Sequence, residues 1–179
     1  ADAKGLLAAA IRDPDPVLFF EHKFLLSTKC EVPDGEHLVP LGKAAVVREG
    51  SDITIIALAA MVPKALKAAE TLAAEHGISA TVIDLRTLVP LDTQTLLRES
   101  ARTGRVFTVE ENPRLCGWGA EIASIIQEEA FSALKQPIVR ITTPHLPVPA
   151  SDQLEDAVVP SVARIVAEIR QAMQARRTR

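Results

Sequence analysis

Apolar residues along the chain alternate between two patterns. Short, continuous apolar runs, typical of strands buried on both faces, occur at 44–48, 53–58, 81–85, 106–109 and 138–141. Stretches with helical apolar spacing follow at 62–76, 92–102, 119–134 and 161–174. Strands that alternate with helices predict a mainly parallel sheet covered on both faces. We therefore expect an α/β three-layer sandwich with a mostly parallel five-stranded sheet, in which 44–48 is an antiparallel edge strand.

The amino-terminal part predicts a further helix and strand that lack a sheet of their own. Residues 2–12 have helical spacing, with Asp2 as a candidate cap and an apolar face. The apolar run 17–20 predicts a buried strand. We interpret 1–26 as the last unit of a preceding α/β domain, 27–43 as a linker and 44–179 as the main domain. The predicted apolar face comprises Ala3, Leu6, Leu7, Ala10 and Ile11.

Composition narrows the classes of function. The net charge is −3, aromatic residues make up 3% of the chain and Tyr is absent, which argues against binding nucleic acid. Cys30 and Cys116 lie far apart and are expected to be reduced thiols of a cytoplasmic protein. No apolar run approaches the roughly 20 residues that cross a membrane, and no secretory leader is evident.

Few residues suggest chemistry. Gly117-Trp118-Gly119 follows a strand and opens a helix, but Ile122 stands where a dinucleotide-binding fingerprint has its third glycine, so we expect a packing role. Glu110 and Glu111 end a predicted parallel strand, where open α/β sheets bind ligands. Neighbouring strand residues point in opposite directions, and we expect Glu111 to brace the following turn. His22 is expected to be structural.

Several segments, taken in order, resemble the β subunits of two-component, thiamine-diphosphate-dependent dehydrogenases for 2-oxo acids and acetoin. The later part is similar to the transketolase carboxy-terminal domain. Within this family, Glu21-His22-Lys23, Glu111-Asn112-Pro113-Arg114 and the segment 143–149 look most like acetoin dehydrogenase, with the pyruvate and branched-chain enzymes as close alternatives. The segments that match the family as a whole are 2–7, 11–16, 19–23, 40–44, 82–92, 103–105, 117–122 and 154–156.

The resemblance implies an α2β2 enzyme that holds thiamine diphosphate and magnesium between its subunits and passes an acyl group to a lipoyl acyltransferase. The diphosphate and metal motif belongs to the α subunit, and the glutamate that activates the cofactor precedes this chain. No catalytic or cofactor-binding residue is therefore carried over, and the isolated chain is expected to be inactive. The chain would contribute to pairing with the α subunit and a second β subunit.

The resemblance also suggests two finer contacts. Similar β subunits dock the peripheral subunit-binding domain of the acyltransferase, in some bacterial relatives through an acidic residue whose position here is taken by Lys135. Some mammalian relatives hold potassium at positions that match Ala10, Asp13 and Asp15. A proline-rich turn closed by Asp13 is the simpler interpretation of that segment.

Two other functions remain open at this point. The chain could be a stand-alone, non-catalytic assembly adaptor, or a nucleotide-binding α/β protein that uses the turn at 117–119. The incomplete glycine fingerprint disfavours the second. The gene sequence upstream of Ala1 would separate the first from an enzyme subunit. The apolar residues of 1–26 also predict that the isolated chain self-associates.

Overall fold

The computed structural model describes residues 1–174 and contains one five-stranded sheet. The strands are β1 (Ala45–Arg48), β2 (Ile53–Ala57), β3 (Ala80–Asp84), β4 (Val106–Pro113) and β5 (Val139–Thr143). Their order across the sheet is β1-β3-β2-β4-β5. β1 pairs antiparallel with β3, and every other pair is parallel. The predicted mostly parallel sheet with one antiparallel edge strand is confirmed, although β1 pairs with β3 rather than with β2, to which it is joined.

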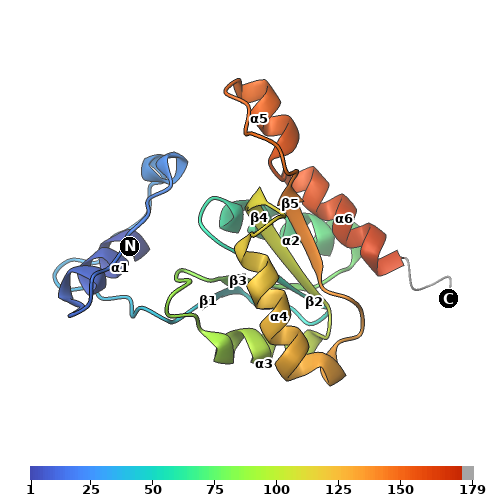
Figure 1. Ribbon diagram of the computed structural model, residues 1–179, viewed down its shortest axis with the longest axis horizontal. Coiled ribbons are helices and arrows are strands. Elements are labelled where there is room, and N and C mark those ends of the chain that lie inside the picture. Colours follow the sequence, from blue (N-terminus) through green and yellow to red (C-terminus); the bar gives the residue numbers. More distant parts are fainter. Residues whose placement is uncertain (175–179) are drawn as a thin grey trace.

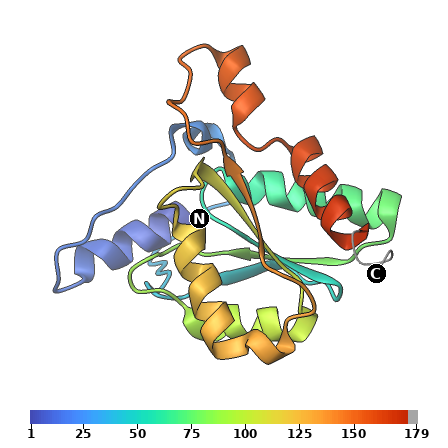
Figure 2. The ribbon, with the colours of Figure 1, turned by 45° about the vertical axis from the view of Figure 1, so that its right-hand side comes forward.

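Helices cover both faces of this sheet (Figures 1 and 2). They are α2 (Met61–His76), α3 (Thr93–Thr103), α4 (Trp118–Ala130) and α6 (Val162–Gln174). α2 and α6 pack on one face, where Ile55 and Leu72 belong to one buried apolar cluster. α3 and α4 pack on the other face, where Ile56 and Leu96 belong to a second cluster. Because consecutive residues of β2 point to opposite faces, both faces need cover, and the predicted three-layer sandwich results.

Capping residues mark the ends of helices that cover the sheet. Asp92 precedes α3, and its Oδ1 accepts a hydrogen bond from the Thr95 amide at 3.1 Å. Gly77 ends α2 with φ 64° and Gly104 ends α3 with φ 69°, both in the left-handed region that favours glycine. Asp92 thus fixes where α3 begins, and the two glycines fix where α2 and α3 end.

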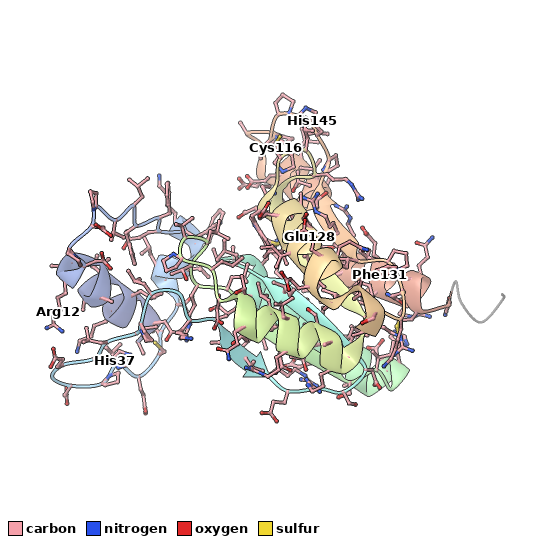
Figure 3. The ribbon with its side chains drawn as sticks, turned by 60° about the horizontal axis from the view of Figure 1, so that its bottom comes forward. Arg12, His37, Cys116, Glu128, Phe131 and His145 are labelled. Atoms are coloured by element: carbon pink, nitrogen blue, oxygen red, sulfur yellow. The ribbon has the colours of Figure 1, made fainter. Side chains whose placement is uncertain are left out.

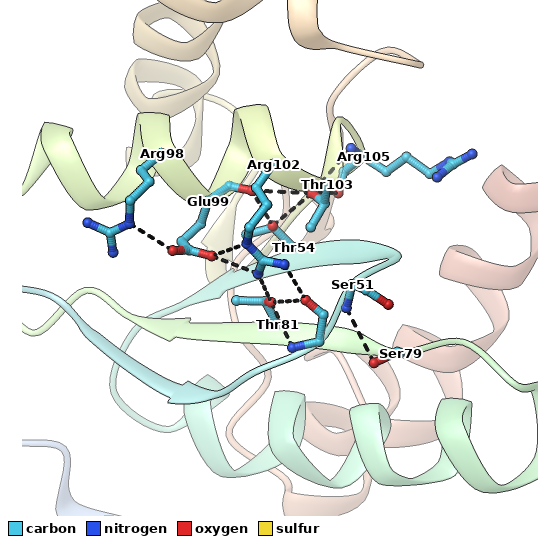
Figure 4. A network of polar contacts seen from close by, with 10 residues as sticks. Ser51, Thr54, Ser79, Thr81, Arg98, Glu99, Arg102, Thr103 and Arg105 are labelled. Atoms are coloured by element: carbon cyan, nitrogen blue, oxygen red, sulfur yellow. Dashed lines mark hydrogen bonds and ion pairs between the residues drawn. The ribbon is translucent and has the colours of Figure 1, made fainter.

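Arg102 fixes the last turn of α3 to the amino ends of β2 and β3 (Figure 4). Its Nη1 donates to the Gly50 carbonyl at 2.8 Å, and its Nη2 donates to Thr81 Oγ1 at 2.6 Å. Its Nε donates to the Glu99 carboxylate at 2.8 Å. The hydroxyl of Thr54, in β2, donates to the Glu99 carbonyl at 3.0 Å. This network holds the β1–β2 turn against the sheet.

The amino-terminal segment lies beside the β1 edge of the sheet (Figure 1). It contains α1 (Asp2–Arg12) and a 3-10 turn, Lys23–Ser27. The helix was predicted, but its apolar face is not a core face in this chain, because Gly5 is its one buried residue and Ile11 is 75% exposed. Asp2 does not cap the helix; its carboxylate forms an ion pair with Arg86 at 2.9 Å.

The apolar run 17–20 forms no strand, which contradicts the prediction of a buried strand. Leu18 is 85% exposed and Phe20 is 88% exposed. An apolar run becomes a buried strand only where a sheet offers it an edge and a covering layer. The run pairs with none of the five strands of the described sheet, so its side chains stay exposed. The division into 1–26, 27–43 and 44–179 stays a prediction.

The carboxy-terminal half differs from the prediction in two places. α4 ends at Ala130, earlier than the predicted helix 119–134, and Phe131 lies in a 3-10 turn with its side chain exposed (Figure 3). A short helix that the sequence pattern did not predict, α5 (Asp152–Val158), extends away from the sheet and has no buried residue (Figure 1). None of the helices within residues 1–174 is long and apolar enough to cross a membrane.

Candidate functional site

Glu110 organises the carboxyl end of β4, the edge at which open α/β sheets bind ligands. Its side chain is fully buried. Arg140, from β5, donates to both carboxylate oxygens, from Nε to Oε1 and from Nη2 to Oε2, each at 2.8 Å. Thr108 Oγ1 donates to Oε1 at 2.7 Å, and Asn112 Nδ2 donates to Oε2 at 3.1 Å. The Gly119 amide donates to Oε2 at 3.1 Å.

These contacts decide the charge of the Glu110 carboxyl. Burial acts to raise the pKa of Glu110, whereas hydrogen bonds from Arg140 and the other donors lower it. The donors outweigh burial, so the pKa lies below its ordinary value and the carboxylate stays ionised. A general acid or base needs a pKa near the working pH and a free oxygen. Glu110 has neither, and it acts as a structural anchor.

The glycines of the 117–119 turn are required by this anchor. A Cβ at Gly119 would collide with the Glu110 carboxylate, and a Cβ at Gly117 would collide with the Asn112 amide. The turn is thus tight because the helix packs close to the sheet, as predicted. The first turn of α4 also directs the Gly119 amide at Glu110. The Glu110 carboxylate thus occupies the position that a phosphate has at the helix of a nucleotide-binding protein. This geometry disfavours the nucleotide-binding alternative.

Glu111 points to the other side of the strand, as predicted, but its role is different from the predicted one. Its two carboxylate oxygens lie 3.2 and 3.1 Å from His22 Nε2. The turn after β4 is braced by Glu110 instead. Glu111 therefore joins the amino-terminal segment to the carboxyl end of the sheet, and His22 has the structural role that was expected of it.

Sequence reasoning missed the buried pair of Glu110 and Arg140. The available signal was Thr108 and Glu110, two polar residues at alternating positions of an otherwise apolar strand. Such a pattern places both side chains on one face, where a buried carboxylate needs a cation. Arg140 sits two residues inside the next apolar run and satisfies that need.

The loops after β4 and β5 form the exposed part of this edge. Figure 3 shows that Cys116 and His145 both lie at the end of the molecule that these loops form. Cys116 and Cys30 are both exposed and unpaired, as expected for free thiols. Leu115 is exposed in the same loop as Cys116, and Val148 is exposed in the loop after β5. Besides the pair of His22 and Glu111, the exposed part of this edge presents apolar and thiol groups.

The candidate cation site lies in the turn after α1. Asp13 Oδ1 accepts a hydrogen bond from the Asp15 amide at 2.9 Å, and the Ala10 carbonyl accepts one from the Asp13 amide at 3.4 Å. Two of the three candidate ligands are thus engaged in closing the turn. Within residues 1–174, no three His, Cys, Asp or Glu side chains gather closely enough to hold a metal ion. Potassium binding by Ala10, Asp13 and Asp15 stays a prediction.

A family model described as the transketolase C-terminal domain matches residues 42–165. The match covers β1 to β5 together with the loops that form the carboxyl edge. The chain belongs to this family. In this transketolase C-terminal domain, the buried pair of Glu110 and Arg140 is the polar centre of the edge described above.

The chain is also similar to larger proteins. It is 47% identical over 97% of its length to the acetoin:2,6-dichlorophenolindophenol oxidoreductase subunit beta of Cupriavidus necator, and covers 51% of that protein. It is 43% identical over 93% of its length to the mitochondrial pyruvate dehydrogenase E1 component subunit beta of Dictyostelium discoideum, and covers 48% of it. The chain thus spans about half the length of these relatives.

A solved structure shares the arrangement of the transketolase C-terminal domain. It is described as a split gene transketolase, inactive beta4 tetramer, and it superposes with a TM-score of 0.68 at 31% identity. The match covers 82% of this chain and 46% of that one. The expected transketolase-like fold is therefore confirmed by a second comparison.

Proposed function

We propose that this chain is the carboxy-terminal part of the β subunit of a thiamine-diphosphate-dependent dehydrogenase that passes an acyl group to a lipoyl acyltransferase. The observation that carries the proposal is the extent of the similarity. The acetoin oxidoreductase β subunit matches 97% of the chain, whereas the domain model begins at residue 42. The similarity therefore includes the amino-terminal segment, which a shared transketolase domain alone does not explain.

We propose acetoin as the substrate of the intact enzyme. The acetoin subunits of Cupriavidus necator and Bacillus subtilis are 47% and 46% identical to the chain, while a pyruvate subunit of Bacillus subtilis is 42% identical. A plant pyruvate subunit, from Pisum sativum, reaches 46%, so identity alone separates the two substrates weakly. Acetoin is favoured because the motifs at 21–23 and 111–114 agree with it as well.

Thiamine diphosphate and magnesium are, in this proposal, held by groups outside this chain. The residues present fit the cofactor poorly. Glu110, the buried carboxylate at the ligand-binding edge of the sheet, uses both oxygens on Arg140 and its other donors. An activating glutamate needs a free oxygen for the cofactor ring. The chain would instead shape and brace the edge that borders the site.

Assembly is the second part of the proposal. The amino-terminal segment exposes apolar side chains, and a folded chain of this size rarely leaves such a patch uncovered. We propose that the α subunit, a second β subunit and the rest of the β subunit cover it. The exposed residues in question are Ile11, Leu18, Phe20, Phe24 and Leu26.

Docking of the peripheral subunit-binding domain of the acyltransferase is the third part of the proposal. Lys135, at the position where some relatives have an acidic residue, donates from Nζ to the Thr103 carbonyl at 2.9 Å. It thereby neutralises the carboxyl end of α3. We propose that docking in this protein relies on other contacts than an acidic residue at this position.

The proposal is tested by mixing the chain with the α subunit of an acetoin dehydrogenase and measuring acetoin-dependent dye reduction. We expect no turnover by the chain alone or by this mixture, and turnover when the β sequence is extended upstream by the length its relatives have. Turnover by the chain alone would refute the proposal. An initiation codon directly before Ala1 in the source gene would favour the assembly adaptor.

A further inference from the structure

A cavity of about 400 Å³ lies at the amino ends of the strands, on the face that α2 and α6 cover. Arg105 directly precedes β4, Gln136 precedes β5, and Arg170 lies on α6. The remaining wall includes His76, the last residue of α2, together with Ile78 and Met173. The cavity is thus at the opposite end of the strands from Glu110 and its anchor.

The charges around this cavity are unbalanced. Arg105 and Arg170 both line it, and none of its lining residues is acidic. Within residues 1–174, neither guanidinium forms an ion pair with a carboxylate, and Arg105 Nη1 makes a long 3.4 Å contact with the Asp52 carbonyl. Arg140 and Arg164, in contrast, are held by Glu110 and Glu168. Two guanidinium groups without carboxylates beside one cavity favour an anion.

Gln136 provides a second, independent observation. The residue is 7% exposed, and within residues 1–174 its Nε2 has no hydrogen-bond partner. A buried amide donor without an acceptor is unfavourable, and native proteins seldom leave one. Since Gln136 lines the same cavity as the two arginines, an oxyanion bound there would accept hydrogen bonds from all three side chains.

We propose that this cavity binds a small organic oxyanion, a carboxylate or a phosphate ester, through Arg105, Arg170 and Gln136. The carbon body of the ligand packs against Ile78 and Met173, which supply the apolar part of the wall. The site is separate from the carboxyl edge on which the proposed dehydrogenase function rests. It links α2, β4 and α6 through one ligand, so its occupation stabilises the folded chain.

The test is titration calorimetry of the full chain with four anions: acetate, pentanoate, inorganic phosphate and butyl phosphate, with potassium chloride at matched ionic strength. We expect saturable binding that is tighter for pentanoate than for acetate, or for butyl phosphate than for phosphate. Binding of the two carboxylates or of the two phosphates shows which of these groups the cavity recognises. Failure of all four to bind saturably would overturn the proposal and leave the dehydrogenase assignment untouched.

Substitutions of the lining residues test whether the anion binds in this cavity. Arg105→Gln and Arg170→Gln should each weaken binding roughly tenfold or more, because each removes a charge-assisted contact. Arg114→Gln removes an exposed guanidinium at the other end of the sheet and serves as the matched control. In NMR spectra, the side-chain amide of Gln136 should shift on binding. Equal weakening by Arg114→Gln, or an unmoved Gln136 resonance, would refute the site.

Arg170→Lys tests whether weaker anion binding results from the loss of the guanidinium contact or from a loss of the fold. It keeps a positive charge on the exposed surface of α6, so the chain retains its fold. Binding should fall between that of the unchanged chain and that of Arg170→Gln, because lysine cannot make the bidentate contact of a guanidinium. Binding by Arg170→Lys as weak as that of Arg170→Gln, or as strong as that of the unchanged chain, would contradict the role given to Arg170.

Discussion

Arg140 donates two hydrogen bonds, each 2.8 Å long, to the Glu110 carboxylate and so joins β5 to the end of β4. The Glu110 side chain is fully buried and the Arg140 side chain is 11% exposed. Such a pair is strongly coupled, because removing one partner leaves the other as an uncompensated buried charge. The same carboxylate also holds the Gly119 amide, so the pair sets the position of α4.

Replacing Glu110 with glutamine should destabilise the fold by about 3–5 kcal/mol, since the Arg140 charge would be left without a counter-charge. The measurement is urea unfolding followed by circular dichroism. The double variant Glu110→Gln/Arg140→Gln should lose less than the sum of the two single variants. Glu70→Gln, which breaks an exposed pair with Lys67, is the control and should leave stability unchanged.

Acid should remove part of this stability. Burial opposes ionisation of Glu110, Asp92 and Glu99, but their hydrogen bonds outweigh it and lower all three pKa values in the folded chain. The stability from the two glutamates is therefore fully present above their unfolded pKa of about 4.5 and is lost as the pH falls through the folded pKa. Unfolding measured from pH 7 to pH 3 should show this loss, and the difference between the chain and Glu110→Gln should shrink over the same range. A difference that stays constant would contradict the anchor role.

Gly119→Ala should destabilise the chain by about 1–3 kcal/mol, because its Cβ would collide with the Glu110 carboxylate and push α4 from the sheet. Thermal unfolding checks the change. Ala120→Ser alters the next residue, which is exposed, and should stay within about 0.5 kcal/mol. Equal effects of the two substitutions would show that the close approach of the helix is unimportant.

His22→Ala should release the amino-terminal segment without unfolding the domain. The contact with Glu111 would be lost, and trypsin should cut faster after Lys23 and Lys29. The stability of the domain should change by about 0.5 kcal/mol or less, because the segment contributes little to the core. His145→Ala is the matched control. Unchanged cleavage of His22→Ala would mean that the segment is held by its other contacts.

Potassium should raise the melting temperature of the β subunit extended to the length of its relatives if Ala10, Asp13 and Asp15 help to bind it. Sodium at the same concentration is the control for ionic strength. Asp13→Asn should reduce the effect, since it removes one charged ligand. If potassium and sodium give the same melting temperature, the cation site should be abandoned and the turn regarded as closed by Asp13 alone.

Much of the fold follows from local signals in the sequence. Gly77 and Gly104 end helices because they adopt a positive φ, Asp92 begins one through its side chain, and the apolar runs mark the strands. Local signals say less about what covers a segment. The run 17–20 has the composition of a buried strand, yet Phe20 is exposed because the run pairs with no strand of the described sheet.

The site was harder to predict because it depends on register. Thr108 pairs with Arg140 across the sheet, and this alignment brings the guanidinium to Glu110. Nothing near Arg140 in the sequence indicates that alignment. For the same reason, Glu111 was predicted to brace the turn after β4, whereas Glu110 does so. Alternation along a strand predicts that the two side chains point in opposite directions, but not which of them points into the core.

The link between β4 and β5 has a consequence for synthesis of the chain. Glu110 leaves the ribosome 30 residues before Arg140. Its carboxylate therefore stays exposed to water until β5 has been synthesised. Until then the carboxyl end of β4 cannot close, because an ionised group would be buried without a counter-ion. Completion of the sheet and neutralisation of this charge are therefore a single late event, and nascent chains that stop before residue 140 should remain open to proteases at this edge.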